Sequence, residues 1–295
     1  MTYINFTARY YSVLRPNFGH RYHLICFDTS KQEILALTMR LAIQAIRRPS
    51  LFVTGIIQPL LWLFLFSALF QNAPIELFTY TTKYSDFLSS GIIVFTAFTS
   101  SLNAGLPIMF DREFGFFNRI LSSPILSRAS ILIASSLNIM LSSYTQVICI
   151  IFTVNILGIN ITNLLGAFVA TITLLALINS VTIISLILAF ILPGHIELLA
   201  CLLVINLPLL FSSTALAPLA FMPSWLQVIA SLNPLTYAIE IIRFSYLHNY
   251  YNTKSIIMNN VWGEINMEQV IFILVLTNII SIWGGQKLIA RKFED

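Results

Sequence analysis

The sequence predicts an all-α membrane protein with six transmembrane helices. Of its 295 residues, 57% are hydrophobic and only 9% are charged, whereas a soluble domain carries about 25% charged residues. Several apolar runs exceed the length of about 20 residues that crosses a hydrocarbon core. The charges gather in the few segments between these runs. The predicted spans cover residues 51–70, 87–109, 131–157, 164–192, 198–219 and 270–289. Pro193-Gly194 marks the break between the fourth and fifth spans.

We divide the chain into a basic tail (1–30), a transmembrane domain (31–290) and a short C-terminal segment (291–295). The tail has no apolar core of the kind that marks a secretory signal, so we expect the first span to be retained. Thirteen of the sixteen Lys and Arg residues lie in the first 49 residues, in the loop after the second span, or at the C-terminus. The positive-inside rule therefore places both termini and this loop on the cytoplasmic or stromal side. An even number of spans agrees with that placement.

A helix is predicted from Lys31 to Arg48, with its polar residues on one side of the helical wheel. We expect it to lie along the membrane interface, with its basic face toward anionic headgroups. Pro49 disfavours helical geometry at Arg48 and lets the chain turn into the bilayer. The basic residues of this interfacial helix are Arg40, Arg47 and Arg48.

The loop after the second span, 110–130, is the one long charged interruption between apolar segments. Its charged residues are Asp111, Arg112, Glu113, Arg119 and Arg128. Apolar residues recur there at helical spacing and predict a short amphipathic helix. They are Phe110, Phe114, Phe117 and Leu121. We interpret it as a docking helix, in which the aromatic face fills a groove in a partner and the charges fix the register. A simply solvated charged loop is the alternative.

The segment between the last two spans, 220–269, is longer than the other outer loops. A tryptophan in it is expected at headgroup level. An Asn-Pro pair can cap and open a helix over 235–247, which carries one acid and one base and is too short to span. We predict a re-entrant or interfacial helix; an ordinary outer loop with one amphipathic helix is the alternative. The residues that define this segment are Trp225, Asn233, Pro234, Glu240 and Arg243.

No catalytic or metal site can be assembled from this sequence. It lacks a GxxxxGK[ST] phosphate loop, so we do not expect it to bind ATP. The four histidines are dispersed, and the three cysteines form no CxxC pair, which indicates small buried hydrophobes instead of a disulfide or zinc site. The expected bound cofactors and metals are none, and the net charge of +4 reflects basic loops, not a nucleic-acid interface.

The predicted spans contain almost no ionisable side chains. Proton-coupled carriers need such groups at depth, so the energy source is expected outside this chain. Amides do occur at depth, and they either bond neighbouring helices or line a substrate path. They are Gln58, Asn103, Asn138, Gln146, Asn179, Asn206 and Asn278.

Three segments resemble ABC-2 type transporter permeases. The charged loop, DREFGF followed by SP and SR, is similar to the family's coupling loop; RRP followed by QPLLW is similar to its first span; and MPSWLQ followed by LNPLTYA and Arg243 is similar to the segment before its last span. The resemblance covers about residues 31–290. It is strongest toward exporters of the drug and nodulation-factor type and toward permease-like proteins of algal plastid genomes. The Ile- and Asn-rich composition suits an AT-rich plastid or bacterial genome.

The resemblance implies a permease subunit that forms a homodimer, with each half docked on a separate ATPase that binds ATP and magnesium. The loop around Glu113 would be the coupling helix, residues 31–48 a connecting helix, and about 222–246 re-entrant helices that close the outer end of the path. Export is implied by the family alone. The substrate and the roles of 1–30 and 246–260 stay unassigned. An ATP-independent membrane-assembly factor and a proton-coupled carrier are the alternatives.

Overall fold

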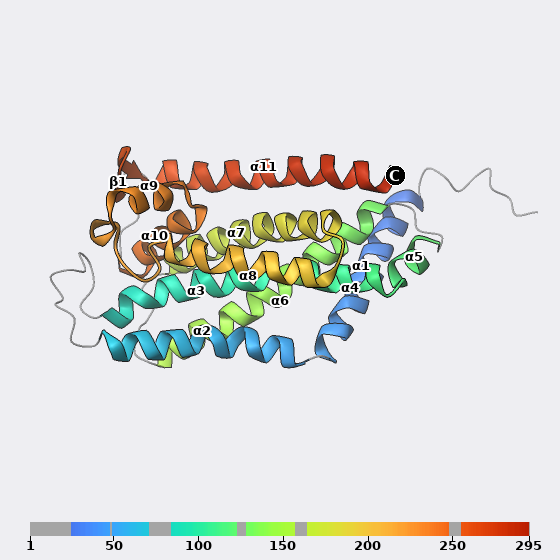
Figure 1. The fold of residues 1–295 in the computed structure, drawn as a ribbon, viewed down its shortest axis with the longest axis horizontal. Helices are drawn as coiled ribbons and strands as arrows, with labels where there is room; N and C mark the ends of the chain where they lie inside the picture. Colours follow the sequence, from blue (N-terminus) through green and yellow to red (C-terminus); the bar gives the residue numbers. More distant parts are fainter. Residues whose placement is uncertain are drawn as a thin grey trace, which may run out of the picture.

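The computed structural model describes residues 25–47, 49–70, 84–122, 128–156, 164–247 and 255–294. Within these ranges the chain is almost entirely helical (Figure 1). The helices are α1 (Ile25–Ile46), α2 (Pro49–Leu69), α3 (Tyr84–Leu102), α4 (Gly105–Glu113), α5 (Phe116–Leu121), α6 (Arg128–Ile156), α7 (Leu164–Ile191), α8 (His195–Phe211), the 3-10 turn η2 (Leu219–Phe221), α9 (Ser224–Leu232), α10 (Pro234–Leu247) and α11 (Met267–Glu294). Two short strands, β1 (Ile256–Asn260) and β2 (Gly263–Asn266), precede α11. The all-α membrane fold is confirmed.

Five helical stretches among the described residues are long and apolar enough to cross a membrane. They are Phe52–Leu69, Tyr84–Glu113, Ser130–Ile156, Leu165–Ile191 and Met267–Gly285. Each matches a predicted span. The remaining predicted span, 198–219, falls on α8, which has 17 residues, and on the irregular turn after it. In Figure 1, α8 runs along the bundle beside the longer helices.

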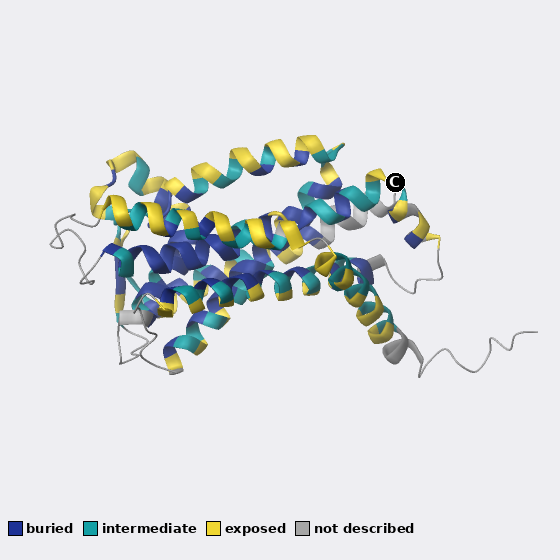
Figure 2. Cartoon of the chain, turned by 90° about the horizontal axis from the view of Figure 1, so that it is seen from below, coloured by how far each residue is buried: buried dark blue, intermediate teal, exposed yellow. Residues whose placement is uncertain are grey.

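Two helices form the centre of the bundle. In the most apolar part of the 84–113 stretch, 72% of the residues are buried, whereas in that of α2 only 11% are buried. α3 is therefore central and α2 is peripheral. α7 contacts α3, α4, α6, α10 and α11. Figure 2 shows buried residues concentrated in the middle of the bundle and exposed residues along the outer helices. The exposed apolar faces suit contact with lipid.

The two ends of the bundle differ in content. In Figure 1, α1, α4, α5 and the C-terminus lie at one end, and α9, α10 and β1 lie at the other. The break predicted at Pro193-Gly194 is confirmed, because α7 ends at Ile191 and α8 begins at His195. Backbone groups in a membrane must be paired within helices, so such breaks are placed at the ends of the bundle.

Three local features differ from the sequence predictions. The first helix begins at Ile25, earlier than the expected Lys31, and residues 1–24 lie outside the described residues. The second predicted span is two helices, interrupted at Asn103–Ala104. The unassigned stretch 246–260 contributes β1, which pairs antiparallel with β2 across a turn at residues 261–262, and Gly263, the first residue of β2, has φ 119°.

Candidate functional site

Three consecutive charged residues, Asp111, Arg112 and Glu113, end α4, and each contacts a different part of the fold. Successive residues on a helix point about 100° apart, so a run of three reaches three neighbours. Together with Arg40 and His195 they form a set that we name the charged corner. It lies at the end of the bundle that holds α1, α4 and the C-terminus (Figure 1).

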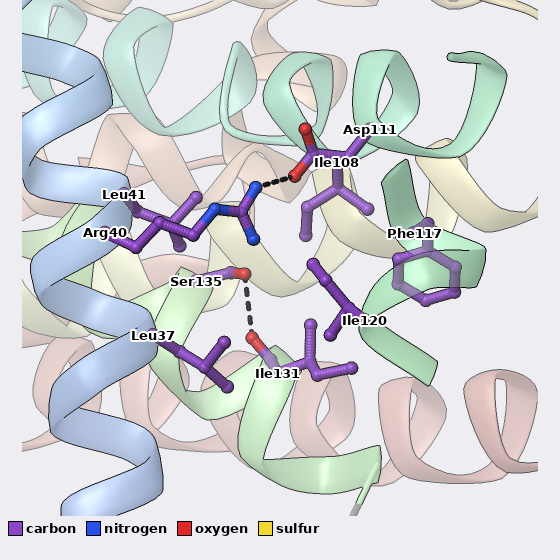
Figure 3. Close-up of a pocket in the computed structure, with 9 residues that line it drawn as sticks. All are labelled: Leu37, Arg40, Leu41, Ile108, Asp111, Phe117, Ile120, Ile131 and Ser135. Atoms are coloured by element: carbon purple, nitrogen blue, oxygen red, sulfur yellow. Dashed lines mark hydrogen bonds and ion pairs between the residues drawn. The ribbon is translucent and has the colours of Figure 1, made fainter. Parts of the chain in front are cut away.

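Asp111 joins α4 to α1. The Arg40 guanidinium lies 2.6 Å from the Asp111 carboxylate and 4.2 Å from the centre of the Phe116 ring. Figure 3 shows Arg40 reaching across a small pocket to Asp111, with apolar side chains below it. Arg40 is thus paired with Asp111, which comes within reach only in three dimensions, while 31% of its side chain stays exposed. That this side chain faces lipid headgroups stays a prediction. Arg47 is exposed.

The outward face of α1 is apolar. It carries Leu35, Met39, Ile43 and Ile46, which are 41–78% exposed. These positions recur at helical spacing and form one stripe. An interfacial helix with this face in lipid and its arginine turned toward the protein fits the structure better than a basic outer face.

Arg112 caps the carboxyl end of α7. Its guanidinium donates hydrogen bonds to the carbonyl oxygens of Ala189 (2.8 Å), Phe190 (3.2 Å) and Pro193 (2.9 Å), and also to that of Leu192. Ala189 and Phe190 lie in the last turn of α7, where carbonyl oxygens have no partners in the helix and carry the negative end of its dipole, whereas Leu192 and Pro193 follow α7 in the turn before α8. The Arg112 guanidinium therefore supplies hydrogen bonds to these carbonyl oxygens and a positive charge at the negative end of the dipole.

Glu113 caps the amino end of α8 from another helix. Its carboxylate accepts the His195 backbone N–H at 2.8 Å, and its other oxygen lies 2.5 Å from His195 Nδ1. The residue at the N-cap position is Gly194, which has no side chain to cap the helix. A carboxylate is favoured there because a helix N-terminus presents free N–H groups and partial positive charge.

The aromatic residues of the charged loop do not share one face. Gly115 has φ +72° and separates α4 from α5, so the single amphipathic helix predicted over this region is wrong. Phe114 is 78% exposed, whereas Phe117 is 6% exposed and packs edge-on against Phe190. Phe114 is therefore the most exposed of these rings, Phe116 is 38% exposed beside the Arg40 guanidinium, and Phe117 belongs to the small core under the corner.

The other predicted residues of the loop divide between surface and undescribed positions. Arg119 is exposed on α5. Arg128 is the first residue of α6, and its side chain, like all of Arg48, lies outside the described part of the chain. The coupling role of these residues stays a prediction.

At the opposite end, α9 and α10 pack as two short helices. The exposed residues Trp225, Val228, Ile229 and Leu232 recur at helical spacing on α9. Asn233 is the predicted cap of α10: its Oδ1 accepts the Leu235 N–H at 3.0 Å, and Pro234 opens the helix. Asn233 Nδ2 also donates to the Leu209 carbonyl at 2.9 Å, which ties α10 to α8.

Glu240 and Arg243 form a buried pair on α10. The guanidinium lies 2.5 Å from the Glu240 carboxylate, donates to the Thr214 carbonyl at 2.8 Å and sits 3.7 Å from the centre of the Phe87 ring. These contacts join α10 to α3 and to the turn after α8. The pair therefore connects the helices at this end of the bundle, and little of either charged side chain is exposed.

Two of the amides at depth bond helices together. Asn179 Nδ2 donates to Asn278 Oδ1 and Asn278 Nδ2 donates to the Ala176 carbonyl, both at 2.8 Å. The hydrogen-bonding interpretation is thus confirmed for this pair, which links α7 to α11.

The sequence predicted no role for His195, which binds Glu113 at the start of α8. Its place directly after the Pro-Gly break was the signal, because a helix start needs a capping group.

Among the described residues no group of three or more His, Cys, Asp and Glu side chains is placed to hold a metal ion.

Comparison with known proteins agrees with this geometry. A profile of the ABC-2 type transporter family matches residues 32–247, which include the charged corner, α9 and α10. The chain belongs to the ABC-2 type transporter family.

Three relatives cover most of the chain. One protein from Porphyra purpurea, named "Putative transport permease ycf38", is 51% identical over 92% of this chain and 96% of its own length. Proteins of the same name from Pyropia yezoensis and Cyanophora paradoxa are 52% and 47% identical, each over 89% of this chain and 90% of its own length. The chain is accordingly a multi-pass membrane protein of a transport permease family.

Proposed function

We propose that this chain is the membrane-spanning permease subunit of an ATP-driven exporter, with ATP and magnesium bound by a separate ATPase subunit. The observation that carries the proposal is the charged corner. One short helix, α4, is bonded to α1, α7 and α8 at the same end of the bundle. A displacement of α4 by a bound ATPase would therefore be transmitted to α1, α7 and α8 together.

The surface that meets the ATPase is proposed to be the exposed part of the α4–α5 turn. Phe114 is the more exposed of its two exposed aromatic rings, and Arg119 is an exposed cation. An aromatic anchor with a charge at its rim is a common pattern in protein interfaces. The residues behind this surface would transmit a displacement of α4 to the helices that they contact. They are Asp111, Arg112, Glu113 and Phe117.

The opposite end is proposed as the outer gate of the path. α9 and α10 are short, lie side by side at that end (Figure 1) and are joined to α3 and α8 through Arg243 and Asn233. As re-entrant helices they would close the path until the spans move.

The setting is proposed to be a plastid membrane, with both termini in the stroma. Relatives of about 50% identity come from red algae and a glaucophyte. A homodimer, with one ATPase on each half, is proposed as the working unit.

The test is a gentle-detergent pull-down of the full chain from its native membrane, followed by mass spectrometry. An ATP-binding cassette protein is expected with the wild type and to be lost when Phe114→Ala and Arg119→Ala are combined. Phe221→Ala is the matched control, because it removes an exposed aromatic at the opposite end of the bundle. Retention of the ATPase by the double variant would contradict the docking surface.

A second measurement separates the alternatives. In the purified complex, ATP with vanadate is expected to change hydrogen exchange in α9 and α10, and Glu113→Ala is expected to abolish the change while the ATPase stays bound. An assembly factor that uses no ATP would show neither the partner nor the change. A proton-coupled carrier would respond to a pH gradient in the absence of nucleotide.

A further inference from the structure

The stretch 84–113 is broken between α3 and α4. Across the turn at Asn103–Ala104, Ala104 and Leu106 each donate to the carbonyl three residues earlier, at 3.2 Å. Pro107 has no N–H to offer to the carbonyl four residues before it. The regular helical ladder therefore lapses for about one turn.

Ser185 of α7 fills this gap. Its hydroxyl donates to the Leu102 carbonyl at 2.5 Å and accepts the Gly105 N–H at 2.9 Å. Ser185 is fully buried. Without it, a buried carbonyl and a buried N–H would both lack a partner, which costs more than an ordinary hydrogen bond contributes.

Gly105 permits the close approach that this contact needs. A Cβ at residue 105 would lie 2.6 Å from the Ser185 carbonyl oxygen and 3.0 Å from the Ala189 Cβ. Real Cβ atoms do not come so near to a backbone oxygen, so a larger residue would push α4 away from α7. The backbones of α4 and α7 are therefore in contact at the beginning of α4.

The other end of α4 is held to the same helix. Arg112 binds the carbonyl oxygens of Ala189 and Phe190. Gly105 contacts Ser185, and Arg112, further along α4, contacts Ala189, further along α7. α4 and α7 therefore run parallel. α4 is thus fixed to α7 at its start and near its end, whereas its link to α3 is a broken turn.

We infer that Ser185 is a positioning residue that keeps the turn between α3 and α4 attached to α7, so that a displacement of α4 is passed to α7. The turn at Asn103–Ala104 is the hinge, and the inserted hydroxyl keeps its two free backbone groups paired on the α7 side. The motion then continues from α7 to α11 through the Asn179–Asn278 bond. This inference rests on the proposed function for the origin of the motion, but the hinge itself does not.

The first arm of the test measures hydrogen exchange of the Gly105 amide in the full-length protein in detergent. Ser185→Ala is expected to speed exchange at this amide about fivefold or more, because one buried hydrogen bond is lost. Gly105→Ala is expected to loosen the same turn by separating the helices. Ser180→Ala is the matched control, since that buried hydroxyl bonds only the Leu177 carbonyl of its own helix.

The second arm uses the ATPase complex trapped with ATP and vanadate. Ser185→Ala is expected to remove the nucleotide-dependent exchange change in α9 and α10 while nucleotide stays bound, and Ser180→Ala is expected to retain it. Equal exchange at Gly105 in the two serine variants would overturn the hinge. Faster exchange with an unaltered nucleotide response would overturn the positioning role. If no ATPase accompanies the wild type, the proposed function fails, while the first arm still decides the hinge.

Discussion

Single charged residues connect helices that are far apart in the sequence. Arg112 contacts residues 77 to 81 positions away, and Glu113 contacts a residue 82 positions away. In each case the side chain meets the free backbone groups of a helix end. A charge at such an end is favoured by both hydrogen bonding and the helix dipole, so its identity and shape matter.

Arg112→Lys is expected to destabilise the protein by about 2 kcal/mol, since a single ammonium cannot reach the several carbonyls that the planar guanidinium bonds. Thermal unfolding in detergent measures this. Arg119→Lys is the control, because Arg119 is exposed and a change there should fall within about 0.5 kcal/mol. Equal melting temperatures for the two variants would contradict the capping of α7.

At the scale of elements, the joint between α7 and α8 depends on a glycine. A Cβ at Gly194 would lie 2.6 Å from the Glu197 carboxylate and 2.9 Å from that of Glu113. Both carboxylates end flexible side chains, so they can rotate away. Glu113 would then lose its bond to the His195 N–H, and α8 would start without a cap.

Gly194→Ala is therefore expected to lower the melting temperature by about 2–4 °C, the range that follows from loss of one helix cap in a chain of this size. Adding Glu113→Ala should give little further loss, since both changes remove the same contact. Gly284→Ala is the matched control, because a Cβ there would meet nothing within 4 Å, and inside α11 the change should keep or raise the melting temperature. Additive losses in the double variant would count against the shared cap.

At the scale of the whole molecule, the charged corner and the hairpin formed by β1 and β2 lie at opposite ends of the bundle (Figure 1). The corner is at the end with α1 and the C-terminus. The hairpin follows α9 and α10 and presents Trp262, which is 70% exposed. If the bundle spans the membrane along its length, these two ends face different compartments.

An impermeant maleimide is expected to label Arg119→Cys and Trp262→Cys from opposite sides of sealed vesicles. The three native cysteines, Cys26, Cys149 and Cys201, are first replaced by alanine. Labelling of both positions from the same side would refute the proposed topology. Labelling of Trp262→Cys from the stromal side alone would reverse the orientation that the positive-inside rule gives.

The sequence by itself determined the features that depend on near neighbours. The apolar runs predicted the long helices, Pro193-Gly194 predicted the break before α8, and Asn233-Pro234 predicted the capped start of α10. Each follows from local hydrophobicity or from a backbone group within a few residues. The family was also recognisable, because its motifs are short and continuous.

Only the tertiary structure decided which side chains meet. The pairing of Arg40 with Asp111 and of Glu113 with His195 joins helices more than 70 positions apart. The burial of Phe117 beside exposed Phe114 depends on the turn at Gly115, and the role of Ser185 depends on the close approach that Gly105 allows. Periodicity gives the face of a helix but not what that face contacts, so these contacts could be known only once α1, α4, α7 and α8 were placed together.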